Sequence, residues 1–110
     1  MKVTIACLNS KYIHMSSAPW CLLAGVRARN ISADCRVMES TINADPTAFA
    51  EEIIAQKPDV LSLSCYIWNI TQTLAVAKAV KTAIGCTVVL GGPEVAYCPK
   101  EILAAYPFVD

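Results

Sequence analysis

The sequence predicts an α/β fold in which an open, doubly wound parallel sheet is covered by helices on both faces, as a three-layer α/β/α sandwich. Short β-branched and apolar runs alternate with segments of helical periodicity, and only short connections separate them. The composition agrees, since 55% of the 110 residues are hydrophobic and only 16% are charged. Strands that are buried on both faces of a parallel sheet are apolar throughout, which accounts for so few charges.

The first predicted unit is a strand followed by a helix. Residues 2–8 are an apolar, β-branched run that ends at Asn9, as a buried strand does. A helix is expected to start at Ser16 or Ser17 and to reach about residue 30, because serine is a good helix cap and Pro19 suits the first turn.

The second unit repeats this pattern. Residues 34–40 are expected to form a strand. Asp45 followed by Pro46 is a cap and a first-turn proline, so a helix is expected to begin there. Pro58 ends that helix, since the residue before a proline avoids helical geometry.

The third unit contains the most central strand, residues 59–65. Asn69 with Gln72 three residues later resembles a capping box, and apolar residues then recur at helical spacing until Gly85. Residues 86–90 are expected to form the fourth strand.

The remaining residues continue the alternation. Residues 91–93, Gly-Gly-Pro, predict a tight turn, and residues 99–105 predict a short helix. Val109 and Asp110 are expected to be the first residues of a fifth strand. Right-handed crossovers between such units favour the flavodoxin-like strand order 2-1-3-4, with ligands binding where the order reverses, at the carboxyl ends of the strands.

Composition excludes several kinds of partner. Nine Lys and Arg balance nine Asp and Glu, and no basic run occurs, so neither nucleic acid nor an acidic membrane surface is expected as a partner. No apolar stretch is long enough to span a membrane. The six cysteines lack the spacing of a metal or iron-sulfur site and are expected to be reduced thiols in a cytoplasmic protein.

The loops at the predicted binding edge hold the chain's unusual residues. His14 is the single histidine, residues 64–69 place two large aromatic side chains just after a buried strand, and residues 91–92 are paired glycines. Each feature also has a plain structural interpretation: a surface histidine, aromatics that pack under a helix, and a simple turn.

Rival chemistries lack their motifs. The first loop contains no glycine, which excludes a dinucleotide fingerprint and a P-loop. The ends of the first and third strands carry no carboxylate, which argues against a magnesium-dependent phosphoacceptor. Cys65 and His14 could form a catalytic pair, but no third residue to orient them is evident.

Three segments at the predicted strand ends carry a family resemblance. Residues 2–14 end in Asn-Ser-Lys-Tyr-Ile-His, residues 58–69 end in Ser-Cys-Tyr-Ile-Trp-Asn, and residues 88–95 contain Gly-Gly-Pro-Glu. Across essentially its whole length, the chain resembles the N-terminal cobalamin-binding domain of radical S-adenosylmethionine proteins.

The resemblance implies a cobalamin site. Ser64 would match the serine beside the cofactor's nucleotide tail, and Gly91 and Gly92 would match the family's glycine pair, while Tyr66 replaces a leucine. Small residues leave a slot for a flat heterocycle there, and a hydroxyl can satisfy a polar atom within it. The residues expected to contact cobalamin are Asn9, Lys11, Tyr12, Ser64, Cys65, Tyr66, Trp68, Gly91, Gly92, Pro93 and Glu94.

The chain departs from the family pattern in its first loop. Many cobalamin domains carry Asp-x-His-x-x-Gly there, and the histidine ligates cobalt. Here Tyr12 stands two residues before His14, where the aspartate would be, so His14 is not expected to be a metal ligand. Tyr12, Tyr66 or Trp68 is expected to cover the lower face of the corrin ring instead.

The resemblance also implies a larger protein. Residues 1–110 would be one domain at the N-terminal end of a chain whose next domain, a radical S-adenosylmethionine barrel, binds an iron-sulfur cluster and S-adenosylmethionine for methyl transfer or related chemistry. The 110 residues would bind cobalamin without catalysing a reaction. Two alternatives remain open: a docking domain whose pocket has degenerated, and a module that binds FMN or another nucleotide.

Overall fold

The computed structural model describes residues 1–11 and 14–110, and its sheet has four parallel strands in the order β2-β1-β3-β4. This order is the one that the sequence predicted. No helix within these residues is long and apolar enough to cross a membrane. The strands are β1 (Lys2–Asn9), β2 (Asp34–Thr41), β3 (Val60–Ser64) and β4 (Thr87–Gly91).

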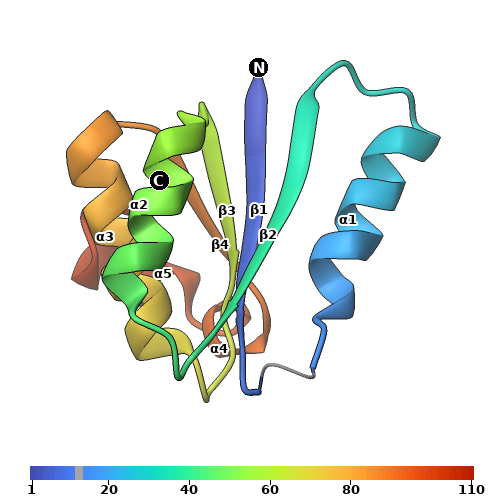
Figure 1. The fold of residues 1–110 in the computed structure, drawn as a ribbon. Coiled ribbons are helices and arrows are strands. Elements are labelled where there is room, and N and C mark those ends of the chain that lie inside the picture. The colour runs from blue at the N-terminus through green and yellow to red at the C-terminus, as the bar shows by residue number, and fades with distance from the viewer. Residues whose placement is uncertain (12–13) are drawn as a thin grey trace.

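Helices lie on both faces of the sheet, as expected for a three-layer sandwich. Figure 1 shows α1 alone on one face, and α2 and α3 together on the other. The short helices α4 and α5 follow β4. The helices are α1 (Ser17–Ala28), α2 (Pro46–Gln56), α3 (Ile70–Ile84), α4 (Pro93–Ala96) and α5 (Pro99–Ala105).

The main hydrophobic core lies between the sheet and the α2–α3 pair. Leu61 and Leu63 of β3 and Val88 of β4 are almost completely buried there against Ile53 of α2 and Val80 of α3. Because successive side chains of a strand point to opposite faces, the residues between these must point toward the α1 side of the sheet.

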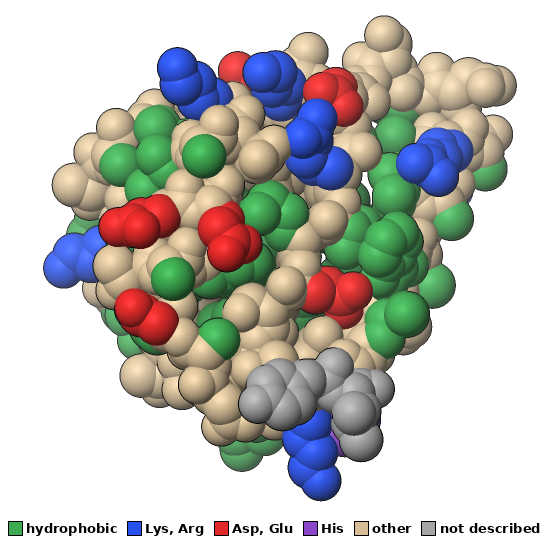
Figure 2. Space-filling view, viewed as in Figure 1, with side chains coloured by type: hydrophobic (Ala, Val, Ile, Leu, Met, Phe, Trp, Pro, Cys, Tyr) green, Lys and Arg blue, Asp and Glu red, His purple; other side chains and the backbone are tan. Residues whose placement is uncertain are grey.

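The α1 side of β3 and β4 carries three small residues and one valine, of which Val89 and Gly91 are exposed, Ser62 is half-buried and Ser64 is buried. Ser62 pairs in register with Val89, and Ser64 pairs with Gly91. Helix α1 packs against β1 and β2, and Val89 is 44% exposed. We call these four residues the uncovered face. Figure 2 shows hydrophobic side chains that remain visible along α1, on the same side of the molecule.

The expected helix starts and ends differ in how they are stabilised. The Asp45 side chain accepts a hydrogen bond from the Thr47 backbone N–H at 2.9 Å, which confirms it as the cap of α2. Ser16 precedes α1 but its side chain makes no capping bond. The Gly-Gly-Pro turn continues directly into α4, a helix that the sequence analysis did not predict.

The expected fifth strand is not formed by Val109 and Asp110. The Asp110 backbone nevertheless lies along β4, since its N–H donates to the Val88 carbonyl at 3.0 Å. The Asp110 carboxylate also accepts from the Val88 N–H at 2.8 Å and from Lys81 at 2.7 Å.

The predicted capping box at Asn69 is wrong. Asn69 is fully buried and makes no cap bond to α3. Its amide nitrogen donates instead to the carbonyls of Leu8 at 3.1 Å and Ser64 at 3.0 Å, and its amide oxygen accepts from the Tyr66 N–H at 2.7 Å. One side chain thus joins the carboxyl ends of β1 and β3 to the loop before α3.

Replacing Asn69 with alanine should lower the free energy of unfolding by about 3 kcal/mol, because three buried backbone groups lose their partner. Chemical denaturation checks this value. The exposed Asn43→Ala variant is the control and should change stability by about 0.5 kcal/mol or less. Equal effects in the two variants would contradict the bridging role.

Candidate functional site

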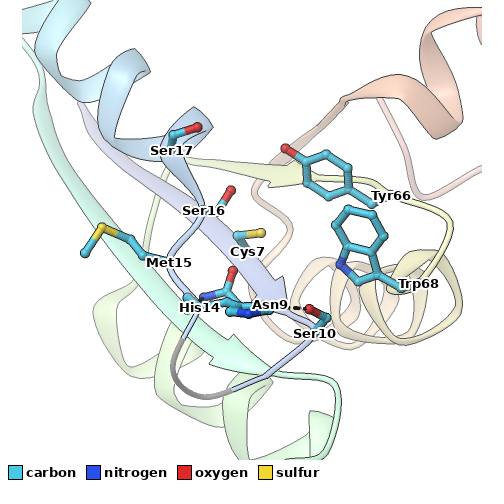
Figure 3. Close-up of a pocket in the computed structure, with 9 residues that line it drawn as sticks. All are labelled: Cys7, Asn9, Ser10, His14, Met15, Ser16, Ser17, Tyr66 and Trp68. Carbon is cyan, nitrogen blue, oxygen red and sulfur yellow. Dashed lines mark hydrogen bonds between the residues drawn. The ribbon is translucent and has the colours of Figure 1, made fainter.

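A cavity of about 310 Å³ opens at the carboxyl ends of β1 and β3, where the strand order reverses. Figure 3 shows Tyr66 and Trp68 on one side of it, and the segment from Met15 to Ser17 on the other. This is the edge at which the sequence predicted a ligand site. The cavity is lined by Cys7, Asn9, Ser10, His14, Met15, Ser16, Ser17, Tyr66 and Trp68.

Tyr66 and Trp68 form one wall of the cavity as a stacked aromatic pair. Their ring centroids are 4.6 Å apart and their planes differ by 3°. Trp68 is 47% exposed, so the pair does not pack under a helix, which was the plain alternative for these residues. The bond from the Tyr66 N–H to Asn69 fixes the backbone from which the pair projects.

Residues 14–17, just before and at the start of α1, form the opposite wall. The Asn9 side chain is buried and donates to the His14 carbonyl at 3.0 Å and to Glu39 of β2 at 3.0 Å. Glu39 also accepts from the Ser16 N–H at 2.9 Å and from the indole N–H of Trp20 at 2.9 Å. The sequence analysis missed Glu39, and its one signal was a carboxylate within a strand.

His14 lies at the cavity with one ring nitrogen engaged. Its Nδ1 is 3.1 Å from the Ser10 hydroxyl oxygen. Within the described residues, no group of three His, Cys, Asp or Glu side chains could hold a metal ion. Lys11 is exposed and does not line the cavity, and the predicted contact from Tyr12 falls outside the described residues.

The glycine pair has two distinct roles. Gly92 has a φ of 106°, and a Cβ there would lie 2.5 Å from the Cys65 carbonyl oxygen. The Cys65 N–H donates to the Gly91 carbonyl at 2.7 Å, which ties the ends of β3 and β4 together. Gly92 is therefore required by the fold. A Cβ at Gly91 would meet nothing within 4 Å, so the space beside Gly91 is open.

The two cysteines nearest the cavity are protonated thiols. Burial, with smaller contributions from Cys7 and Glu94, raises the pKa of Cys65 to about 12. Burial also raises the pKa of Cys7. Because the thiolate is the nucleophile, neither residue suits a catalytic Cys-His pair at neutral pH.

The predicted contact residues fall into three groups. Asn9, Tyr66 and Trp68 line the cavity, and Ser64 and Gly91 lie on the uncovered face next to it. The other described ones lie outside the lining: Lys11, Pro93 and Glu94 are exposed, the Cys65 side chain is fully buried, and Gly92 contacts the Cys65 backbone. Contact with a ligand stays a prediction for all of them.

Comparisons with known proteins find one matching family and two similar methyltransferases. Residues 3–110 match the B12 binding domain. The chain is 33% identical, over 106 residues, to the 2-(S-pantetheinyl)-carbapenam-3-carboxylate methyltransferase of Streptantibioticus cattleyicolor. The matched region covers 90% of this chain and 16% of that protein. The chain is also 46% identical, over 55 residues, to the cobalamin-dependent radical SAM methyltransferase TokK of Streptomyces tokunonensis. This match covers 49% of this chain and 8% of TokK. The chain therefore spans a small part of these relatives.

The two glycines should respond oppositely to alanine. Gly92→Ala should lower the free energy of unfolding by about 3 kcal/mol, because its φ is positive and its Cβ would meet backbone. Gly91→Ala should change it by about 0.5 kcal/mol or less. Thermal or chemical denaturation measures both, and a more damaging change at Gly91 would contradict these roles.

The buried thiols should resist alkylation. At pH 8, iodoacetamide should modify the exposed Cys21 and leave Cys7 and Cys65 unmodified in the folded protein, because burial both hides these thiols and raises their pKa. Mass spectrometry of proteolytic peptides reads out each site. Unfolding in guanidinium should make all three react, and rapid modification of Cys65 in the folded chain would contradict its placement.

Proposed function

The chain belongs to the B12 binding domain family, and on that premise we propose that it holds cobalamin against the stacked aromatic pair, with the nucleotide tail on the uncovered face of β3 and β4. The single observation that carries this placement is the open space beside Gly91, next to Ser64, at the edge where Tyr66 and Trp68 project.

The uncovered face suits the flat heterocycle of the tail. Ser62, Ser64 and Gly91 are small, and Val89 adds an exposed apolar contact. No protein atom lies within 4 Å of where a Cβ of Gly91 would be, whereas a Cβ at Gly92 would meet the Cys65 backbone. The Ser64 hydroxyl supplies a donor and acceptor for a polar atom of the heterocycle.

The carboxyl edge suits the corrin ring. Tyr66 and Trp68 present a half-exposed, rigid aromatic surface, which favours contact with a large planar group. We assign the lower face of the corrin to this pair rather than to His14. Asn9, Ser10 and residues 14–17 border the same cavity and would orient the side groups of the ring.

Bound cobalamin supplies a cobalt centre that can carry and release a methyl group. The described residues that line the cavity would bind and orient the cofactor and shield one side of it from water. This division of work matches a domain that binds without catalysing.

The whole protein is proposed to be a radical S-adenosylmethionine methyltransferase. The similarity to TokK, a cobalamin-dependent radical SAM methyltransferase, supports this proposal, as does the similarity to the second methyltransferase. The iron-sulfur cluster and S-adenosylmethionine would bind in a separate barrel domain that partners this one. The six free cysteines suit a reducing compartment, and we propose the cytoplasm.

Incubation with hydroxocobalamin followed by desalting tests the proposal. The chain should retain the visible absorbance of the corrin, and His14→Ala should leave that spectrum unchanged. Gly91→Leu should abolish retention, because its side chain fills the space assigned to the tail. Ala48→Leu on the exposed surface of α2 is the matched control and should bind normally.

The other outcomes separate the alternatives. No corrin absorbance in the unaltered chain would contradict cobalamin binding and favour a docking domain. Retention of flavin instead would favour a nucleotide-binding module. Normal binding by Gly91→Leu would overturn the placement of the tail.

A further inference from the structure

One carboxylate organises the wall of the cavity opposite the aromatic pair. Oε1 of Glu39 accepts from the Asn9 amide at 3.0 Å and from the Ser16 N–H at 2.9 Å. Its Oε2 accepts from the Trp20 indole N–H at 2.9 Å. Glu39 itself does not line the cavity. It therefore joins the end of β1 to the residue before α1 and to the first turns of that helix.

Helix α1 depends on this contact more than an ordinary helix would. Ser16 makes no side-chain cap, and the first turn of α1 carries no acidic residue. Glu39 supplies from the neighbouring strand an acceptor for the N–H of Ser16, the residue before the helix, and the negative charge that a helix N-terminus favours.

The residues that Glu39 joins, at the end of β1 and the start of α1, also line most of the cavity. Among the described residues, seven of the nine that line the cavity lie in the range from Cys7 to Ser17. Glu39 accepts hydrogen bonds from Asn9 and Ser16. The Asn9 amide also donates to the His14 carbonyl at 3.0 Å, so His14 is held indirectly by Glu39. The position of this wall is thus set by a residue 23 to 30 positions further along the chain.

We propose that Glu39 is a positioning residue for cobalamin, which holds Asn9 and residues 14–17 at the distance from Tyr66 and Trp68 that the corrin requires. This inference rests on the proposed function. It adds a residue that touches no cofactor and controls affinity by fixing the positions of these residues before cobalamin arrives.

Glu39 is ionised in this arrangement. Burial raises the pKa of its carboxyl, but the hydrogen bonds from Asn9, Ser16 and Trp20 together outweigh burial and lower it. A charged acceptor makes stronger hydrogen bonds than a neutral one.

Glu39→Gln tests the proposal with little change in volume. The glutamine carbonyl oxygen can still accept from Asn9 and Ser16. Its NH2 group would then replace the oxygen that accepts from Trp20 and would place a donor against the indole N–H. Cobalamin affinity, measured by titration of the visible spectrum, should fall about tenfold. The double variant Glu39→Gln/Trp20→Phe removes the opposed donor and should recover most of the lost affinity. Glu52→Gln, on the exposed side of α2, is the matched control and should bind like the unaltered chain.

Thermal unfolding of the cobalamin-free variants separates positioning from folding. Weaker binding by folded Glu39→Gln, together with rescue by the second substitution, supports the proposal. Unchanged affinity in Glu39→Gln overturns it, and so does a weaker affinity that Trp20→Phe fails to rescue. A failure of the unaltered chain to bind hydroxocobalamin would be a separate result, which overturns the proposed function and this role with it.

Discussion

The buried amide of Asn69 is the interaction on which the binding edge depends. Strands β1 and β3 are neighbours in the sheet, but their pairing ends at Ala6 and Leu63, so the backbone carbonyls of Leu8 and Ser64 lie beyond the last β1–β3 pair. Asn69 satisfies both and at the same time accepts from Tyr66. Burial of an amide is costly unless all its groups are bonded, so the arrangement has one geometry rather than several. The position of the stacked aromatic pair follows from it.

The two faces of the sheet serve different purposes. The α2–α3 face holds the large apolar side chains and supplies the stability of the domain. The α1 face is covered over β1 and β2 and carries small residues on β3 and β4. The open half lies beside the cavity at the strand ends, so a ligand with a ring system and an extended tail can contact both. A single asymmetry of packing thereby prepares the site.

Local chemistry in the sequence predicted most of the fold. Asp45 with Pro46 marked a helix start because the cap and its partner are two residues apart, and the strand order followed from regular alternation. The same reasoning failed at Asn69, whose spacing to Gln72 suggested a cap, whereas its amide bonds to Tyr66, to Ser64 and to Leu8, which is 61 residues away. Glu39 was missed for the same reason, since nothing near it in the sequence indicates three donors from two other elements. Ser64 and Gly91 came from family resemblance, and register then placed them side by side.

The central claim is that cobalamin lies across the carboxyl edge, with its tail on the α1 side of β3 and β4. A crystal structure of the chain grown with hydroxocobalamin tests this most directly. The account predicts the heterocycle of the tail against Ser64 and Gly91, and the lower face of the corrin against Tyr66 or Trp68, with no protein nitrogen bound to cobalt. A tail on the α2–α3 side of the sheet, or cobalt ligated by His14, would contradict it.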